Sequence, residues 1–453
     1  MKLPVLPPNF EVIFKGLTSY QFMKVTQGGF GMTVKGEYLP WNQLRYRDPP
    51  ESLTHEAWWM GLRLARLGAF STLPLLDKLG RPFVFAMPEV VQIHLHHLDQ
   101  DLAGTLRSEP EVITPAHRDE FLLRSLIEES ITSSQLEGAS TTRKVAEAML
   151  REARQPRTHS ERMIYNNFLT MRAIQEFREE PFTPKRILEL HRLLTDGTLD
   201  DPADAGRLRR SDDVFVYNND DGSILHKPPS CTELPERLER LCAFANASES
   251  DRPFVHPVLR AILLHFMLGY DHPFVDGNGR TARALFYWSM LRSGYWLTEF
   301  ISISRILKQA PAQYGMAYLH TESDEGDTTY FLIHQLQTIR KAVDELHAFL
   351  ARRKKEQRDL ERLIAPASEW GALLNHRQLA ILTHAIRRPG ATYRIIEHQR
   401  IHGISYQTAR TDLLGLVDLA LLDQGREGKA FLFIAPPDLK QRIGRLGAKS
   451  SKT

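Results

Sequence analysis

The stretch "HPFVDGNGRTAR", His272 to Arg283, places one histidine, one aspartate, one asparagine, two glycines and two arginines within twelve residues. It follows an apolar run, "HPVLRAILLHFMLGY", whose three- and four-residue spacing predicts a helix. It leads directly into "RTARALFYWSMLR", which predicts a second helix. Between the two helices "DGNG" predicts a turn, because glycine and asparagine favour turn conformations. The stretch therefore predicts a helix–loop–helix with its polar groups gathered at the loop.

The residue types in this loop suit a reaction at a phosphate. Small residues before a helix N-terminus leave backbone N–H groups and the positive end of the helix dipole facing an anion. Arg280 and Arg283 share one helix face and can both bind a polyphosphate. Asp276 supplies the oxygen ligand that Mg²⁺ prefers, and His272 can act as a general base near neutral pH. The pattern predicts phosphoryl or nucleotidyl transfer, whereas "DGNG" alone would indicate only a glycine-capped corner.

The whole stretch resembles the signature of the Fic family, His-x-Phe-x-Asp/Glu-Gly-Asn-Gly-Arg-x-x-Arg, at every defined position. "GRLR" (206–209), "KPP" (227–229) and the preceding helix also resemble the family, over about residues 20–345 in all. The resemblance implies a mainly α fold: a Fic-type helical core with a short β-hairpin flap, after a mixed N-terminal region. Asp271 departs from the family, which usually has an apolar residue there; it either tunes the basicity of His272 or faces solvent.

The flap is predicted by two short runs, Val214–Tyr217 and Ile224–His226, on either side of an Asn/Asp/Gly turn. The resemblance implies that this hairpin covers the nucleotide and aligns a target segment by strand addition. It implies transfer of AMP from ATP, with Mg²⁺ as cofactor, to a Ser, Thr or Tyr hydroxyl of a protein, including the chain itself. His272 would be the base, Asp276 would hold Mg²⁺, and Arg280 and Arg283 would contact the β and γ phosphates. The residues implied to contact ATP are Val214, Phe215, Val216, Tyr217, Asp276, Gly277, Asn278, Gly279, Arg280, Thr281, Ala282, Arg283 and Tyr314.

A second stretch, "SSQLEG" from Ser133 to Gly138, resembles the inhibitory motif of the same family, Ser/Thr-x-x-x-Glu-Gly/Asn. Ser133 and Glu137 are four residues apart and share a helix face, and Gly138 suits a helix C-terminus. Taken alone, the pattern indicates a surface helix with a solvated glutamate. The resemblance implies that Glu137 pairs with Arg283 and removes that guanidinium from the γ-phosphate. The same carboxylate could instead position water for removal of AMP.

The C-terminal stretch "HGISYQTARTDLLGLVDLALLDQGREGKAFLFI" resembles a winged helix-turn-helix. Ser405 is a good N-cap for a recognition helix. The exposed face of this helix would carry Gln407, Thr408, Arg410 and Thr411, with Arg387, Arg388, Arg394 and Arg400 near DNA phosphates. Ala409, Leu413 and Leu416 would pack inward. Asp412 and Asp418 on the same helix weigh against DNA, so protein contacts or dimerisation remain an alternative.

Two other functions stay open from the sequence. One is a DNA-binding transcriptional regulator whose Fic-like core senses nucleotide, and the other is transfer of a different phosphate-containing group. A homodimer is also left open. A net charge of +3 excludes a globally basic nucleic-acid coat. Two cysteines, no CxxC pair and no apolar run of roughly 18 residues indicate a reducing, cytoplasmic location without a membrane partner.

The length of 453 residues predicts about three domains. We expect an N-terminal Fic-associated region at 1–112 and a catalytic domain, with its inhibitory helix, at 113–345. A connecting helix is expected at 346–368, a winged helix-turn-helix at 369–438, and a flexible tail at 439–453.

Overall fold

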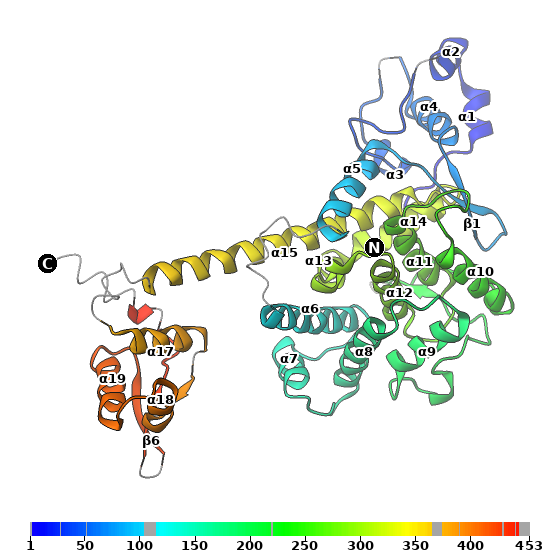
Figure 1. Ribbon diagram of the computed structural model, residues 1–453. Helices are drawn as coiled ribbons and strands as arrows, with labels where there is room; N and C mark the ends of the chain where they lie inside the picture. Colours follow the sequence, from blue (N-terminus) through cyan, green and yellow to red (C-terminus); the bar gives the residue numbers. More distant parts are fainter. Residues whose placement is uncertain are drawn as a thin grey trace. The chain divides into compact units, whose positions relative to one another are not determined.

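The computed structural model describes residues 2–27, 29–50, 52–103, 115–218, 221–364, 374–388, 390–427, 430–439 and 441–443. The chain divides into two compact units, Met1–His347 and Ala348–Thr453. Helices dominate the first unit (Figure 1), as the sequence predicts.

The centre of the first unit is the helix pair α11 (Pro257–Asp271) and α12 (Asn278–Arg292), which pack against each other on either side of the predicted loop. Both helices are buried around most of their circumference, which explains why their sequences are apolar on nearly every side. The helices that pack against this pair are α6 (Pro115–Leu136), α8 (His159–Glu176), α9 (Pro184–Thr195) and α10 (Leu234–Asn246).

Shorter elements complete the unit. These are α7 (Arg143–Arg151), α13 (Ile303–Gln309), α14 (Pro311–Ser323), the 3₁₀ turns η3 (Pro202–Asp204), η4 (Cys231–Glu233) and η5 (Trp296–Phe300), and the π-helical turn η1 (Asp99–Ala103). The predicted hairpin is present as β3 (Val216–Tyr217) paired with β4 (Ile224–His226). Strand β3 is shorter than expected, because Val214 and Phe215 lie outside the pairing.

The N-terminal region joins the core that contains α11 and α12. Its first helices, α1 (Phe10–Gly16), α2 (Ser19–Gln27), α3 (Trp41–Leu44) and α4 (His55–Leu67), share a small core of their own. The hairpin β1 (Ser71–Leu76)–β2 (Pro82–Phe85) and helix α5 (Glu89–Leu98) instead pack into the main core. The ring of Phe83 lies 5.3 Å from that of Phe266 and 5.1 Å from that of Tyr270. Because of this packing, the boundary expected at 112/113 does not separate compact units.

The second unit contains α17 (His376–Arg387), α18 (Ile395–His402) and α19 (Tyr406–Asp418), followed by the hairpin β6 (Asp423–Glu427)–β7 (Ala430–Ile434). This is the expected element order. A two-residue strand, β5 (Thr392–Tyr393), pairs with β7 and gives the antiparallel order β5-β7-β6. Two residues are too few to show an alternating pattern in a sequence, so this strand was not predicted.

Two expected segments differ from the structure. The connecting helix is not separate, because α15 (Thr329–Ile364) is continuous from well inside the first unit. The start of the expected tail is packed: Leu439 and Ile443, four residues apart, are both buried in the core of the second unit. Residues 365–368 and 444–453 of these two segments lie outside the described residues. Among the described residues, each helix is too short or too polar to span a lipid bilayer.

Replacing Trp288 by alanine should destabilise the first unit, because this side chain on α12 is fully buried and stacks on Phe182 at 3.9 Å. We expect the free energy of unfolding to fall by about 3–5 kcal/mol, measured by urea titration with circular dichroism. The exposed Leu79→Ala variant is the control and should change stability by less than about 0.5 kcal/mol. Equal stability of the two variants would contradict this account of the core.

Candidate active site

The loop between α11 and α12 is held in one tight conformation. His272 ends α11 in the left-handed region, with φ 45° and ψ 56°, and Gly277 begins α12 with φ 82°. A Cβ at Gly277 would lie 2.7 Å from Cγ2 of Thr195, so the close packing there requires glycine. The Asn278 side chain accepts from the Phe274 N–H at 2.9 Å and donates to the Phe274 carbonyl at 2.8 Å. These contacts fix where the loop places its backbone.

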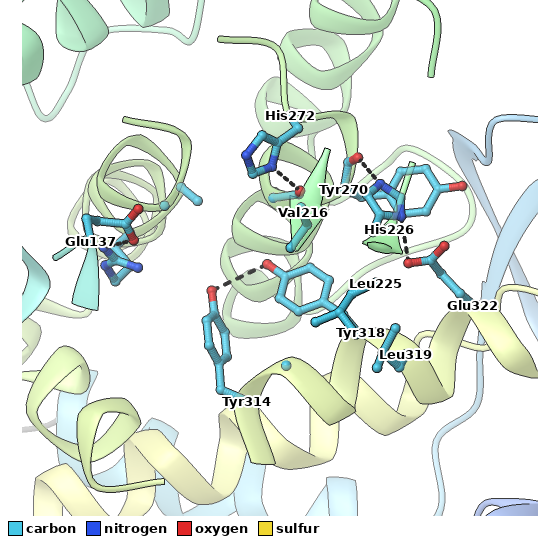
Figure 2. A pocket seen from close by; sticks show the side chains of 15 residues that line it. Glu137, Val216, Leu225, His226, Tyr270, His272, Tyr314, Tyr318, Leu319 and Glu322 are labelled. Carbon is cyan, nitrogen blue, oxygen red and sulfur yellow. Dashed lines mark hydrogen bonds and ion pairs between the residues drawn. The ribbon is translucent and has the colours of Figure 1, made fainter. Parts of the chain in front are cut away.

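The imidazole of His272 lines a cavity beside this loop (Figure 2). Its Nδ1 lies 3.1 Å from the Gly269 carbonyl oxygen, so Nδ1 carries the proton and donates. Burial lowers the pKa of His272 below its ordinary value, and the hydrogen bond to Gly269 acts in the opposite direction. His272 is therefore neutral at neutral pH, with Nε2 as its proton-accepting atom.

Glu137 lies directly at the N-terminus of α12. Its Oε1 accepts from Nη2 of Arg283 at 2.8 Å. A Cβ built on Gly279 would lie only 2.1 Å from the same Oε1, so the carboxylate lies against the first turn of the helix. Gly277 gives α12 no side-chain cap, and the first N–H groups of a helix have no partner within it. A carboxylate thus occupies the position where a helix N-terminus attracts an anion.

Arg283 is held from a second side by α6. Its Nε donates to the Ser133 hydroxyl at 2.8 Å, and its Nη2 donates to the Ser133 carbonyl oxygen at 3.0 Å. Helix α6 ends at Leu136, so Glu137 lies one residue beyond the helix, and Gly138 follows with φ 92°. Burial acts to raise the pKa of the Glu137 carboxyl, but the charge and hydrogen bond of Arg283 hold this pKa below its usual value. The carboxylate is therefore ionised at neutral pH.

The position of α6 depends on a buried glutamate that the sequence did not reveal. Oε2 of Glu129 accepts from the Ser302 hydroxyl at 2.8 Å and from the Ser304 N–H at 3.1 Å. The Ser304 hydroxyl donates to the other carboxylate oxygen. Glu129 anchors α6 to the start of α13 and so sets where Glu137 meets α12. A glutamate among other polar residues of a predicted helix gives no sequence signal for such a contact.

The cavity beside His272 has a volume of about 230 Å³. Val216 of the flap and Tyr314, Tyr318 and Leu319 of α14 form apolar parts of its wall. Figure 2 shows Glu137 on one side of the cavity and His226 with Glu322 on the other. Nδ1 of His226 lies 2.8 Å from Oε1 of Glu322, and its Nε2 donates to the Tyr270 carbonyl oxygen at 2.7 Å. The cavity thus combines aromatic walls with an ionic group at each end.

The structure brings only some of the predicted site residues to this cavity. Those lining it are Glu137, Val216, His272, Gly279, Ala282, Arg283 and Tyr314. Those outside the lining are Ser133, Gly138, Val214, Phe215, Tyr217, Asp276, Gly277, Asn278, Arg280 and Thr281. The Thr281 hydroxyl donates to the Gly277 carbonyl oxygen, four residues earlier in the chain, and the side chain does not line the cavity.

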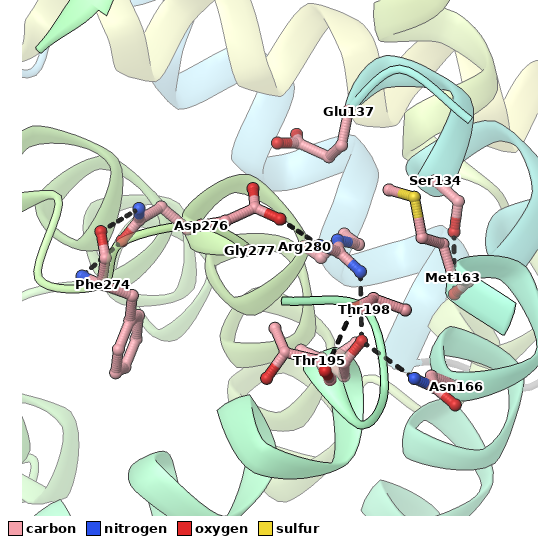
Figure 3. A network of polar contacts seen from close by, with 12 residues as sticks. Ser134, Glu137, Met163, Asn166, Thr195, Thr198, Phe274, Asp276, Gly277 and Arg280 are labelled. Atoms are coloured by element: carbon pink, nitrogen blue, oxygen red, sulfur yellow. Dashed lines mark hydrogen bonds and ion pairs between the residues drawn. The ribbon is translucent and has the colours of Figure 1, made fainter. Parts of the chain in front are cut away.

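Arg280 does not share the environment of Arg283. Its fully buried guanidinium donates to the Leu194 carbonyl oxygen and to Oδ2 of Asp276, both at 3.1 Å (Figure 3). The two arginines therefore do not line the same cavity, and their contacts with the phosphates of ATP stay a prediction. Arg280 binds a carbonyl oxygen in the last turn of α9 (Pro184–Thr195), a contact that the helix spacing alone does not show.

Two further side chains, neither predicted, hold the loop. His191 accepts from the Gly206 N–H at Nδ1, at 3.0 Å, and donates from Nε2 to the Asp276 carbonyl oxygen, at 2.8 Å. Arg209, of the "GRLR" stretch, donates to the His272 carbonyl oxygen at 3.0 Å. It also contacts Asp212 at 2.7 Å, at the start of the flap. These residues connect α9 and the flap to the loop.

Asp271, which departs from the family signature, does not face solvent. It is buried and accepts from Nε and Nη2 of Arg237 at 2.9 and 2.7 Å. Arg237 also donates to the Leu76 and Asp77 carbonyl oxygens. Burial raises the pKa of the Asp271 carboxyl, against the charge of Arg237. Through Arg237, the aspartate therefore connects the end of α11 to the β1–β2 hairpin. Of the two alternatives that the sequence left open for Asp271, exposure to solvent is wrong, and an effect on the basicity of His272 stays a prediction.

The protein offers one carboxylate for a magnesium ion at this site, so the phosphates of a bound substrate would have to supply further ligands. Asp276 is a half-exposed carboxylate beside the loop, and its Oδ2 also accepts from Arg280. The described residues contain no cluster of three or more histidine, cysteine or acidic side chains able to hold a metal. Mg²⁺ commonly takes one or two carboxylates and completes its coordination with water and substrate phosphates. The residues present fit that arrangement, in which Asp276 would be the protein ligand.

Comparisons with known proteins agree with this architecture. Residues 181–290 match the Fic/DOC family model. The protein adenylyltransferase Fic of Drosophila grimshawi is 38% identical over 113 residues, 25% of this chain and 21% of the relative. The corresponding Drosophila melanogaster protein is 39% identical over 113 residues, 25% of this chain and 20% of the relative. The chain therefore spans about a fifth of the length of these curated relatives.

The fold is also similar to that of a solved Fic family protein from Desulfovibrio desulfuricans G20, with a TM-score of 0.53 and 18% identity. That match covers 77% of this chain and 97% of the other. The chain carries a Fic domain in a mainly α fold. The matched residues include the loop and helix that hold His272 and Arg283.

Acid should destabilise the first unit in a way that depends on His191. Burial lowers the pKa of His191 to about 4, while the unfolded imidazole keeps its ordinary pKa near 6.5. Between these values only the unfolded state binds the proton, so stability is fully present above about pH 6.5 and falls as the pH drops toward 4. This one group should contribute a slope of about 1.4 kcal/mol per pH unit.

The measurement is urea unfolding of wild type and His191→Gln at a series of pH values between 7 and 4.5. In the variant, the dependence of the free energy of unfolding on pH should be smaller by the contribution of about one proton. Buried His320 and His334, whose pKa values are also lowered to about 4, should still contribute to this dependence. If the dependence of the free energy of unfolding on pH were the same in His191→Gln as in wild type, the assignment of a neutral imidazole with two hydrogen bonds would be wrong.

Proposed function

We propose that this chain is a protein adenylyltransferase that moves AMP from ATP to a hydroxyl group of a protein and is held inactive by Glu137. The observation that carries the proposal is the shared cavity: the neutral His272 imidazole, the N-terminus of α12 and the Arg283–Glu137 ion pair all meet there. The partial match to proteins named adenylyltransferases supports AMP as the transferred group.

The chemistry assigned to each group follows from its position. Nε2 of His272 takes the proton from the target hydroxyl. The hydroxyl oxygen then forms a bond to the α-phosphorus, the bond between that phosphorus and the bridging oxygen breaks, and pyrophosphate leaves. Backbone N–H groups at the start of α12 and the Arg283 guanidinium stabilise the phosphate charge. Mg²⁺, bound by Asp276 and the phosphates of ATP, would supply further charge neutralisation.

Inhibition follows from competition for one position. The Glu137 carboxylate lies against Gly279 and binds Arg283, so an anionic phosphate at the same helix N-terminus would meet a like charge and an occupied guanidinium. ATP in this state should bind with its phosphates displaced from His272. The same carboxylate is also a candidate for activating water in the hydrolytic removal of AMP from a modified target.

The flap supplies a docking edge for the target. Strands β3 and β4 form a two-stranded sheet, and no other described strand pairs with β3. Val216 lines the cavity, while its neighbour Tyr217 is half-exposed beside Ile224 on the paired strand. A target segment that adds to β3 would bring its hydroxyl toward His272, with the exposed pair contacting its side chains.

Removing the Glu137 carboxylate should release self-modification. We expect Glu137→Gly to raise incorporation of AMP from α-labelled ATP with Mg²⁺ by about 10- to 100-fold, because a charge-assisted hydrogen bond to Arg283 is lost. Glu137→Gly combined with His272→Ala should return incorporation to background. The assay follows label on the protein after gel separation.

The matched control is Glu152→Gly, which removes an exposed glutamate at the end of the neighbouring helix α7 and should leave incorporation at the wild-type level. If Glu137→Gly were no more active than wild type, the assignment of inhibition would fail. If the His272→Ala combination stayed active, the assignment of the base would fail.

We propose DNA binding by the second unit as a second candidate function, on the strength of one specific observation. Asp412, whose charge on α19 weighs against DNA binding in the sequence, is buried and accepts from Nε of Arg377 at 2.7 Å and from His398 at 3.1 Å. Gln407, Arg410 and Thr411 are exposed on that helix, which Ser405 caps. Because the Asp412 carboxylate is buried and paired, its negative charge is not presented on the exposed face of α19, which favours contact of that face with a phosphate backbone. The side chain of Arg387 lies outside the described residues.

Binding to a fluorescent DNA duplex should weaken steeply with salt. Arg410→Ala should reduce the slope of the logarithm of affinity against the logarithm of salt concentration by about 1. The control is Arg172→Ala, an exposed arginine on α8, which should leave the slope unchanged. Fluorescence anisotropy at several salt concentrations makes the measurement, and salt-independent or absent binding would remove this function.

A further inference from the structure

A second cavity, of about 300 Å³, lies on the other side of helix α14 from the candidate active site. Tyr314, Tyr318 and Leu319 of α14 line the first cavity, whereas Gln313, Met316 and His320 line the second. The remaining wall comes from α15 and from the segment at Tyr38–Gln43 in the N-terminal region. The two cavities have no lining residue in common. The second cavity is thus a separate site.

Two tyrosine rings of this cavity are fixed from behind. The Tyr38 hydroxyl donates to Oδ2 of Asp327 at 2.6 Å, and the Tyr330 hydroxyl donates to Oδ2 of Asp324 at 2.7 Å. Arg66, which is fully buried, donates to the Tyr330 hydroxyl at 2.7 Å and lies 3.8 Å from the centre of the Tyr38 ring. The hydroxyl groups of both tyrosines are therefore held by Asp327, Asp324 and Arg66. These contacts fix the two rings in place as rigid walls of the cavity.

The described residues that line the cavity carry no full charge at neutral pH. The acidic groups lie behind the tyrosine rings, and the remaining polar lining consists of two histidines and the three glutamines Gln43, Gln313 and Gln337. Burial lowers the pKa values of His320 and His334 to about 4, so both imidazoles are neutral. A charged ligand would find no counter-charge in this lining.

One ring nitrogen of each histidine is closed off from the cavity. Nε2 of His320 and Nδ1 of His334 have no hydrogen-bond partner among the described residues and are buried from solvent, so a ligand in the cavity does not reach them. The ring nitrogens left for a ligand are the other two, Nδ1 of His320 and Nε2 of His334.

We propose that this cavity is a second binding site, for a neutral, planar heterocycle of the nucleobase or nucleoside type. Aromatic walls can pack against the ring of such a molecule, and neutral imidazoles and glutamine amides can pair with its ring N–H, carbonyl and nitrogen groups. A cavity that combines apolar walls with a few convergent polar groups is the usual form of a small-molecule site. The inference does not depend on the transfer reaction, because it concerns a different cavity.

The test measures binding of adenosine, guanosine, cytidine and uridine to the full chain by calorimetry and saturation-transfer NMR. At least one nucleoside should bind. Gln337→Trp places an indole at the exposed edge of the cavity and should weaken that binding at least about tenfold. His320→Phe keeps an aromatic ring but removes its nitrogens and should weaken binding about fivefold or more.

The matched control is Gln309→Trp, an exposed glutamine at the end of α13 that lines neither cavity; its affinity should equal that of wild type. Circular dichroism verifies that each variant is folded. Absence of binding by all four nucleosides, or affinity unchanged in Gln337→Trp, overturns the proposal. A nucleoside that binds only at the active-site cavity would bind Gln337→Trp with unchanged affinity, so this outcome also overturns the proposal. Incorporation of AMP by Glu137→Gly is measured separately, so failure here is distinct from failure of the transferase function.

Discussion

The ion pair between Arg283 and Glu137, at the uncapped N-terminus of α12, is the interaction on which the functional account depends. A helix N-terminus attracts negative charge, and here a carboxylate of the same chain lies at that position and binds Arg283. In the proposed function, a phosphate of ATP competes with this carboxylate for the same position. The proposal therefore links catalysis and inhibition through one cation, Arg283.

This competition requires that the competing groups be held in fixed places. Asn278 closes the loop on itself, His191 binds it from α9, and Arg209 binds the His272 carbonyl oxygen. On the other side, Glu129 anchors α6 to α13, so that Glu137 arrives at the first turn of α12. Most of these contacts are buried, where an unpaired partner would be costly. The rigidity of the site thus comes from satisfied polar groups around an apolar helix pair.

Helix α14 belongs to two cavities at once. One of its faces contributes Tyr314 and Tyr318 to the cavity beside His272, and another contributes Gln313 and His320 to the second cavity. The chemistry of the two differs: the first has an ionic group at each end, and the lining of the second is neutral at physiological pH. A single helix can therefore present sites for ligands of opposite character, because its side chains leave it in different directions.

The sequence by itself determined the helix–loop–helix, the short hairpin, and the three helices and hairpin of the second unit, since each depends on local spacing. The pairing of Glu137 with Arg283 was implied by the resemblance to the Fic family, because the pattern alone indicated a solvated glutamate. The tertiary structure decided the rest. Arg280 binds the Leu194 carbonyl oxygen and Asp276, and both Asp271 and Asp412 are buried beside arginines. Residues 71–102 contribute to the main core, and Leu439 and Ile443 are buried where a tail was expected. Periodicity shows which face a side chain is on, but a buried polar group is stabilised by partners distant in the chain. Only the folded structure brings those partners together.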